Sequence, residues 1–586
     1  MADLIKLTID GIEVEVPQGT TVLEAADKLN IKIPRLCFLK DINEIGACRM
    51  CIVDTGARTF QASCVLPAAN GMVVKTNTPA LRSARRTNLE LLLSNHDKKC
   101  LSCVRSQNCE LQKLCVELNV ENGDRFAGEM GEYSVDRLSP SLERDNNKCI
   151  LCRRCVSVCK QNQYVGVIGA VGRGFKTQIA SAWDMSLNDT ACVGCGQCII
   201  HCPVGALRER SEIEAVWSAL ADPTKHVCVQ TAPAVRAALG EEFGFPMGTD
   251  VTSQMVDALH RLGFDKVFDT DFGADETIVE EAAELIRRVK NGGVMPMTTS
   301  CCPSWVKFCE TYYPEFLPNV STCKSPHQMA GATMKSYYAQ KAGIDPKNIV
   351  NVSVMPCTAK KFEKTRDELN VDGYRDVDLV ITTRELAKMI KQAGIDFRNL
   401  NDGKGFDKLL GESSGAGVIF GAAGGVAEAA LRTAYEGLTG ETLKNVDFHP
   451  VRGIQNIKEA VIKIGDRDLH CVAVNGLSNA AKVLDSIKSG EKHYDFIEVM
   501  ACPGGCVNGG GQPIITPEVR EKIDPRAVRA SALYRADVDK PIRKSHENTE
   551  IKELYKEFML EPGGHVAHKH LHTHFYARPL YTDEEK

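Results

Sequence analysis

Two short cysteine runs with the same spacing constrain this chain more than any other feature of its sequence. Residues 149–159 and 192–202 each have the pattern C-x2-C-x2-C-x3-C. Four thiolates at this spacing bind a cubane iron–sulfur cluster, and in paired runs the fourth cysteine of each run ligates the cluster of the other. The sequence therefore predicts two [4Fe–4S] clusters in one small domain.

This internal repeat is the run found in bacterial two-cluster ferredoxins, including the proline that follows the second run. The crossed arrangement predicts both ligand sets. One cluster takes Cys149, Cys152, Cys155 and Cys202, and the other takes Cys192, Cys195, Cys198 and Cys159.

The cysteine content indicates metal binding for the remaining thiols, in preference to disulfide formation. The chain has 25 cysteines, and its first 20 residues carry acids every few positions without the apolar core of a secretory signal. We therefore expect a cytoplasmic protein, in which thiols bind metal more often than they form structural disulfides. The net charge of −5, without a basic tract or a long apolar run, predicts neither a nucleic-acid partner nor a membrane span.

Residues 1–80 have the pattern of a small β-rich unit with its own metal site. Two alternating runs flank Asp10-Gly11, which predicts a hairpin, and residues 21–30 have helical periodicity. Four cysteines follow with the spacing C-x10-C-x2-C-x12-C, namely Cys37, Cys48, Cys51 and Cys64. This pattern favours a [2Fe–2S] cluster, whereas the alternative, a zinc site, would favour two close pairs.

A second set follows a helical stretch over residues 84–95. Its members are His96, Cys100, Cys103 and Cys109. One imidazole and three thiolates could bind zinc, and on spacing alone zinc is a serious alternative. The position of the set between two other electron carriers favours a His-ligated [4Fe–4S] cluster.

Residues 213–586 alternate apolar strand-like segments with helical ones, which predicts an α/β domain. Three strand-like segments run into cysteine, at Cys302, at Cys357 and at Cys502 with Cys506. Four thiolates supplied by loops at strand ends are sufficient for another cubane, held inside the folded domain. Cys301 directly precedes Cys302, and consecutive Cα atoms about 3.8 Å apart are too close for a relaxed disulfide, so we expect separate roles.

Three segments carry a resemblance to a known family. "TSCCPSW", "MPCTAKKFE" and "EVMACPGGCVNGGGQP" resemble the signature segments of [FeFe]-hydrogenases, and their order and the modules before them resemble that family along essentially the whole chain. The resemblance implies a multidomain α/β and α+β fold. Its expected parts are a β-grasp [2Fe–2S] domain (1–80), a [4Fe–4S] domain with one histidine and three cysteine ligands (81–135), a two-[4Fe–4S] ferredoxin domain (136–212), an H-cluster domain (213–515) and a small-subunit-like tail (516–586).

The resemblance also implies the cofactor and its pocket. Cys302, Cys357, Cys502 and Cys506 would bind the [4Fe–4S] part of the H-cluster, and Cys506 would bridge to a diiron unit with CO, cyanide and an azadithiolate. Lys360 would hydrogen-bond a cyanide, and the diiron pocket would be lined by Met355, Met500, Ala232 and Pro233. Two positions depart from the family: Ala234 replaces a common Ser, and His327 replaces a frequent Gln.

The reaction implied is the reversible reduction of two protons to H2, and the resemblance implies a proton route for it. Cys301 would be the first relay, followed by Glu284, Ser321 and Glu363, with Arg288 near the entrance. Spacing alone indicates something less specific, because positions 280, 284 and 288 are four apart and would form a solvated helix face with an i,i+4 ion pair.

The modules before the H-cluster domain resemble those of hydrogenases that dock to flavin-containing, NAD(P)-reactive subunits. We therefore expect the catalytic subunit of a multimeric, electron-bifurcating hydrogenase, with ferredoxin as a further partner and maturation proteins that load the diiron unit. The alternatives are a stand-alone ferredoxin-linked hydrogenase, an H2 sensor, a non-catalytic electron-transfer subunit and an iron–sulfur assembly relative.

Two further features receive structural predictions. The histidine-rich tail, residues 565–574, is predicted to pack on the catalytic domain, although a metal-binding tract is an alternative. The remaining cysteines are predicted to be buried small hydrophobic residues: Cys115, Cys228, Cys309, Cys323 and Cys471.

Overall fold

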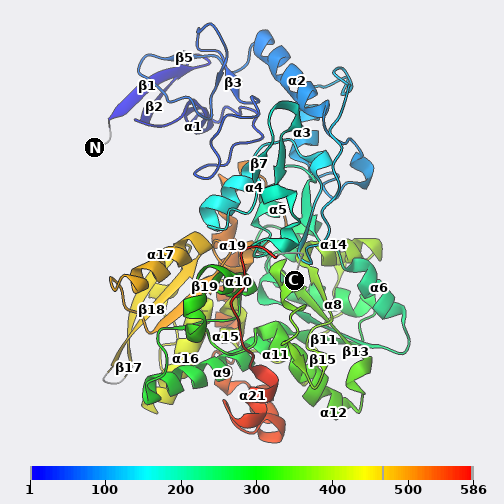
Figure 1. The fold of residues 1–586 in the computed structure, drawn as a ribbon, viewed down its shortest axis with the longest axis vertical. Coiled ribbons are helices and arrows are strands. Elements are labelled where there is room, and N and C mark those ends of the chain that lie inside the picture. Colours follow the sequence, from blue (N-terminus) through cyan, green and yellow to red (C-terminus); the bar gives the residue numbers. More distant parts are fainter. Residues whose placement is uncertain (1–2, 465–466, 583–586) are drawn as a thin grey trace.

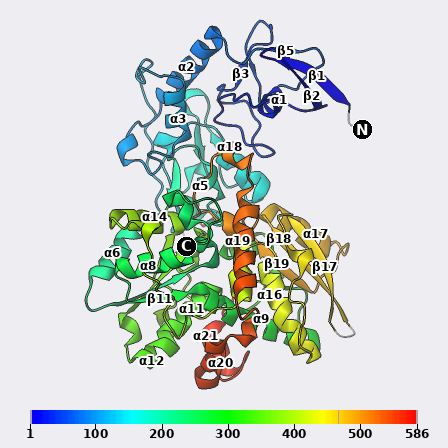
Figure 2. The same ribbon diagram turned by 180° about the vertical axis from the view of Figure 1, so that it is seen from behind.

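The computed structural model describes residues 3–464 and 467–582. The N-terminal cysteine-rich modules form one end of an elongated molecule, and the larger α/β part forms the other (Figure 1). Seen from behind, helix α19 (Pro525–Asp539) runs along the middle of the larger part, between its two sheets in this view (Figure 2). In the described part of the chain, no helix is both long enough and apolar enough to cross a membrane.

The N-terminal module is a small sheet covered by one helix. The sheet has the order β2 (Ile12–Pro17), β1 (Leu4–Ile9) and β5 (Val73–Val74), and the helix is α1 (Val22–Lys28). Asp10 and Gly11 connect β1 and β2 with φ angles of 50° and 85°, as the Asp-Gly turn predicts. Thr21 and Glu24 form a capping box at the start of α1, which explains where that helix begins.

Two sheets form the centre of the larger part. The first is entirely parallel, with the order β11 (Lys266–Asp269), β10 (His226–Thr231), β13 (Ile349–Met355) and β16 (Leu379–Thr382). The second has the order β12 (Met297–Thr298), β19 (Phe496–Met500), β18 (Arg467–Asn475) and β17 (Ile457–Ile464), with only β17 antiparallel to its neighbour. Nearly every residue of β10 and β13 is buried, the polar ones included, so both faces of these strands are covered, as is usual in a parallel sheet.

The ends of these strands position the segments singled out in the sequence. Ala232 follows β10, Cys357 follows β13 shortly after its last residue, and Cys502 does the same after β19. Cys302 lies after β12 and immediately before helix α10 (Pro303–Tyr312). Since these strands are parallel within each sheet, their carboxyl ends bring the segments together, which is where open α/β sheets bind ligands.

Helix α9 (Thr270–Asn291) corrects one expectation from spacing. Positions 280, 284 and 288 do not form a solvated face, because Glu280 is fully buried and Glu284 is only 3% exposed. The helix is covered by α11 (Pro326–Thr333), α15 (Gly415–Val418) and α16 (Gly425–Thr439), and also by the C-terminal segment. The i,i+4 ion pair does form, with 2.6 Å between Arg288 Nη2 and Glu284 Oε1.

The C-terminal segment packs on the catalytic part, as predicted for the histidine-rich tail. Helix α21 (His565–Leu571) contacts α11, and both His570 and His572 are buried. All 25 cysteines are free within the described residues. Of the five without a predicted metal role, four are buried as expected, whereas Cys115 is partly exposed.

Candidate active site

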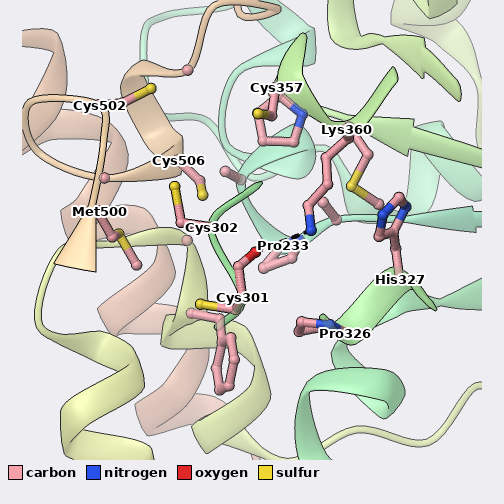
Figure 3. A pocket seen from close by; sticks show the side chains of 18 of the residues that line it. Pro233, Cys301, Cys302, Pro326, His327, Cys357, Lys360, Met500, Cys502 and Cys506 are labelled. Atoms are coloured by element: carbon pink, nitrogen blue, oxygen red, sulfur yellow. Dashed lines mark hydrogen bonds between the residues drawn. The ribbon is translucent and has the colours of Figure 1, made fainter. Parts of the chain in front are cut away.

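A cavity lined mostly by buried residues lies where the carboxyl ends of the two sheets meet. It is lined by Cys302, Cys357, Cys502 and Cys506, and also by Cys301, Lys360, Met355, Met500, Ala232 and Pro233. Figure 3 shows Cys302 with its sulfur beside Cys506, while the sulfur of Cys301 points to another side. The structure thus brings both neighbouring cysteines to one cavity on different sides of the chain.

The donor set fits an iron–sulfur cluster. Burial raises the pKa of Cys302, Cys357 and Cys506, so these thiols need a strong local cation to become thiolates. A bound metal deprotonates a coordinating thiol outright, and four convergent thiolates are the usual ligands of a cubane. The main-chain N–H of Ala501 already donates to Cys302 Sγ at 3.4 Å, a contact that favours the thiolate.

One glycine makes the loop between the last two ligands possible. Gly505 has φ 95° and ψ −162°, a conformation that is essentially restricted to glycine. A Cβ at this position would lie 2.6 Å from the main-chain nitrogen of Ala423 and 2.9 Å from Met500 Sδ. The tight approach of this loop to the cavity wall therefore excludes any larger residue.

Lys360 brings an ammonium group to the cavity. Its Nζ donates to Glu363 Oε2 at 2.8 Å and to the Cys301 carbonyl at 3.0 Å. Glu363 also accepts hydrogen bonds from Ser325 and His327, and its pKa falls to about 2 because the charge of Lys360 and these hydrogen bonds outweigh its burial. The structure therefore places Glu363 in a network with Lys360, whereas the family resemblance implies a position after Ser321 on the proton route.

Both departures from the family line this cavity. Ala234 contributes only a methyl group, whereas His327 is fully buried and its Nδ1 lies 3.0 Å from Ser353 Oγ. Burial, followed by the nearby charge of Lys360, lowers the pKa of His327 to about 4. The imidazole is therefore neutral at pH 7.

Three of the predicted proton-route residues form one hydrogen-bonded group. Ser321 Oγ donates to Glu284 Oε2 at 2.8 Å, and Arg288 holds the other oxygen of the same carboxylate. Cys301 lies at the cavity, and its pKa is raised by burial and then by the charge of Glu281. Glu281 therefore lies near both Cys301 and the carboxylate of Glu284. The sequence did not single out this residue.

Glu281 is fully buried, and neither of its carboxylate oxygens has a hydrogen-bond partner among the described residues. Burial, then the charge of Glu284, raises its pKa to about 8, although the Ser300 main chain and the Ser321 hydroxyl lie close enough to oppose this. The available signal was its i,i+3 spacing from Glu284, which places both carboxyls on one side of the helix.

The ferredoxin-like module has two cavities of similar size. One, with about 440 Å³ of empty space, is lined by Cys149, Cys152, Cys155 and Cys202. The other, with about 450 Å³, is lined by Cys159, Cys192, Cys195 and Cys198. Each cavity thus collects three cysteines of one run and the fourth of the other, which is the crossed arrangement that two cubanes require.

The two N-terminal sets also converge. The thiol of Cys37 lies within hydrogen-bonding distance of Cys48 and Cys64, and Cys51 lies beside Cys64. His96 is buried, the Lys148 main chain lies beside its ring, and its Nδ1 has no partner in the part of the chain that the structure describes. An imidazole with one nitrogen fixed by a main-chain group and the other free has the usual form of a metal ligand.

These features define an iron–sulfur oxidoreductase, and comparison with known proteins identifies its kind. Models described as "Iron only hydrogenase large subunit, C-terminal domain" and "Iron hydrogenase small subunit" match residues 225–510 and 522–578. Models for a 2Fe-2S iron-sulfur cluster binding domain, the NADH-ubiquinone oxidoreductase-G iron-sulfur binding region and a 4Fe-4S dicluster domain match residues 2–79, 85–124 and 130–206.

The similarity to individual proteins extends over the whole chain. The chain is 50% identical to NADP-reducing hydrogenase subunit HndD of Solidesulfovibrio fructosivorans, over 98% of this chain and 99% of that protein. It is 45% identical to iron hydrogenase 1 of Clostridium pasteurianum, over 97% and 99%. A solved structure of apo [FeFe]-hydrogenase HydA1 from Chlamydomonas reinhardtii matches with 44% identity and a TM-score of 0.56, over 63% of this chain and 99% of that one.

The chain therefore belongs to the iron-only, or [FeFe], hydrogenases, which are oxidoreductases that act on hydrogen. The order of matched modules confirms the predicted fold class. Similarity to an assembly protein, cytosolic iron-sulfur assembly component 3 of Bos taurus, is weaker, at 29% identity over 67% of this chain and 84% of that protein.

Proposed function

We propose that this hydrogenase is the catalytic subunit of a cytoplasmic multimeric complex that exchanges electrons with NAD(P) through a flavin-containing subunit. Full-length similarity to a subunit of an NADP-reducing hydrogenase carries the proposal. The match to an NADH-ubiquinone oxidoreductase-G region supports it, because that region is named for an NADH-linked enzyme. Ferredoxin is the second electron partner in this proposal, and the complex bifurcates electrons between the two.

The surface of the N-terminal module supports docking at that end. Ile45 and Val65 are 42% and 43% exposed, close in sequence to the cluster ligands Cys48 and Cys64. Exposed apolar side chains beside a cluster loop are suited to a redox partner, which must approach closely for electron transfer. Electrons would enter at this module and pass to the buried cavity.

The cofactor complement proposed is one [2Fe–2S] cluster, three accessory [4Fe–4S] clusters, one of them ligated by His96, and an H-cluster. Cys302, Cys357, Cys502 and Cys506 would hold the cubane of the H-cluster, with Cys506 also on the diiron side. Maturation proteins would insert the diiron unit. When bound, the H-cluster supplies the site at which two protons and two electrons combine to H2.

The protein's part in the reaction is to enclose this site and to supply protons. Met355, Met500 and Pro233 give the cavity an apolar wall that excludes bulk water, and Lys360 offers a cation to anionic ligands of the cofactor. Cys301 is the proton donor at the cavity. A thiol that stays protonated through burial is suited to hold a proton until the site accepts it.

Beyond Cys301, the proposed route continues through Glu281 and Ser321 to Glu284. Glu281 carries its proton at neutral pH and lies between the cavity and the Ser321–Glu284 pair, whose oxygens are 2.8 Å apart. Arg288 holds Glu284 in position. Glu363 is left out, because its contacts tie it to Lys360 instead.

The test is anaerobic purification of the native complex, followed by assays of H2-dependent reduction of NAD+ and NADP+ with and without ferredoxin. We expect flavin-containing partners to co-purify and nicotinamide reduction to depend on them. Infrared bands of bound CO and cyanide would establish the cofactor. If the chain purifies alone and reduces only ferredoxin, the multimeric proposal fails and the stand-alone alternative, supported by similarity to iron hydrogenase 1, replaces it.

A further inference from the structure

We propose that the C-terminal segment gives the proton route a second connection with solvent, through Thr322, His572 and His568. This inference rests on the proposed route as far as Glu284. It adds three residues from the loop before α11 and from the tail, which are called the tail branch below.

The Arg288 end of the route lacks a group that can pass a proton. The Arg288 guanidinium donates to Glu284 Oε1 at 2.6 Å and to four main-chain carbonyls at 3.1–3.3 Å, those of Val294, Pro318, Asn319 and Val320. An arginine side chain does not lose its proton in proteins. Arg288 therefore fixes the Glu284 carboxylate, and the exchange of protons with water needs another titratable neighbour.

The tail branch begins at the other oxygen of Glu284. Thr322 Oγ1 donates to Glu284 Oε2 at 3.4 Å, and the Thr322 main-chain N–H donates to the same oxygen at 3.1 Å. His572 Nδ1 lies 2.8 Å from Thr322 Oγ1. A carboxylate oxygen of Glu284, the sulfur of Cys323 and a ring nitrogen of His572 also lie within 4.8 Å of one another. Hydrogen bonds therefore run without a gap from Glu284 to the imidazole of the tail.

The second nitrogen of that imidazole is also fixed. His572 Nε2 lies 2.9 Å from Glu280 Oε2, and Glu280 accepts further hydrogen bonds from the Gly563 main chain and the Tyr555 hydroxyl. Both Glu280 and His572 are buried. Each ring nitrogen of His572 thus faces an oxygen that can exchange a proton with it, that of Thr322 on one side and that of Glu280 on the other, as a relay residue requires.

His568 is the outer member of the branch. It is exposed, and its ring lies nearly parallel to that of His572, with centroids 3.9 Å apart and an interplanar angle of 16°. Both rings come from the end of α21. The charged groups around them are Glu280, Glu284 and Arg287 from α9, while the thiol of Cys323 and the Tyr555 hydroxyl complete the surroundings.

The transfer steps involve only N–H and O–H bonds. In this sequence the neutral His572 carries its hydrogen on Nδ1, toward Thr322, and takes a proton from water on Nε2, the nitrogen opposite Glu280, where the parallel ring of His568 borders it. His572 then gives its Nδ1 proton to Thr322 Oγ1, while the Thr322 hydroxyl proton moves to Glu284 Oε2. From Glu284 the proton continues to Ser321 and inward, and the reverse sequence releases protons during H2 oxidation.

The variants that test this are His572→Gln and His568→Gln, with His574→Gln as the matched control. His574 lies on the same segment and is exposed, so its replacement should change nothing. Glutamine retains hydrogen bonding but cannot carry a second proton. We expect H2 evolution with an artificial electron donor to fall about tenfold in His572→Gln, equivalent to about 1.4 kcal/mol of barrier. The solvent deuterium isotope effect should rise, and imidazole should restore turnover in His572→Ala.

Infrared bands of the loaded cofactor separate a proton-transfer defect from a folding defect. If His572→Gln fails to fold, the exposed His568→Gln remains, and we expect it to shift the pH profile of H2 evolution without changing the bands. Unchanged rates, isotope effects and pH profiles in both histidine variants would overturn the tail branch. Glu284→Gln distinguishes failure of the tail branch from failure of the proposed proton route. If Glu284→Gln is inactive and both histidine variants are fully active, only the tail branch is contradicted. If Glu284→Gln is fully active, the proton route itself is contradicted.

Discussion

The carboxyl of Glu281 should hold its proton at neutral pH. The structure raises its pKa from 4.5 to about 8, first through complete burial and then through the charge of Glu284. The difference corresponds to about 5 kcal/mol against the ionised form. At pH 7 about nine-tenths of the molecules would therefore carry the protonated carboxyl, against fewer than about one in a hundred for an exposed glutamate.

Infrared spectroscopy measures this directly, because a protonated carboxyl has a C=O stretch that an ionised one lacks. The band assigned to Glu281 should be absent from Glu281→Gln and should disappear in the wild type as the pH rises through about 8. Glu276 is the matched control: it lies on the same helix, is buried, and also has its pKa raised to about 8. Glu276→Gln should remove a different band and leave turnover intact.

The sign of the pH dependence follows from the direction of the shift. The folded state binds the Glu281 proton more tightly than the unfolded state does. The contribution of this group to the free energy of unfolding therefore decreases as the pH rises from about 4.5 to about 8, and the group destabilises the folded state most at high pH. H2 evolution should decline over the upper part of this range as Glu281 ionises. A Glu281 carboxyl that titrates near 4.5, or a Glu281→Gln enzyme with intact cofactors and full turnover, would refute the reasoning.

Two further predictions concern the cavity and the contact between modules. Cys301→Ala should retain its clusters, measured as iron content and by infrared bands, but lose most H2 evolution; near-normal turnover would remove Cys301 from the route. Arg384→Ala should leave Glu209 buried without its 2.7 Å partner, at a cost of about 3–5 kcal/mol. We expect faster limited proteolysis between the ferredoxin-like and catalytic parts, whereas Lys388→Ala, with its ammonium 3.9 Å from the same carboxylate and its side chain partly exposed, should behave like the wild type. Equal protease resistance in Arg384→Ala and the wild type would contradict this.

The cluster sets were accessible from the sequence because their geometry is local. Within a C-x2-C-x2-C run the backbone itself brings three sulfurs to one point, and only the crossed fourth ligand depends on the fold. The hairpin at Asp10-Gly11 is local in the same sense, since two consecutive positive φ angles specify it.

The residues of the proposed proton route were harder to predict from the sequence, because burial decides their chemistry and burial is a tertiary property. Spacing describes Glu280 and Glu284 as a surface pattern, yet α16, α11 and the tail cover α9 from several sides. Glu363 shows the limit of the family resemblance. The resemblance places this carboxyl on the proton route, whereas its hydrogen bonds in the structure join it to His327 and Lys360.

The adjacent cysteines show how far geometry alone can assign function. Cys302 precedes α10, and its sulfur accepts a hydrogen bond from the Ala501 main chain on the side where the other predicted ligands converge. Cys301 points away from these thiols, and its pKa responds to Glu281 on α9. Consecutive residues with different side-chain directions thus meet two different environments, one formed by sulfur and one formed by carboxyls. These environments support the proposed division between a metal ligand and a proton donor, since thiolates bind iron whereas a protonated thiol near a protonated carboxyl can exchange a proton with it.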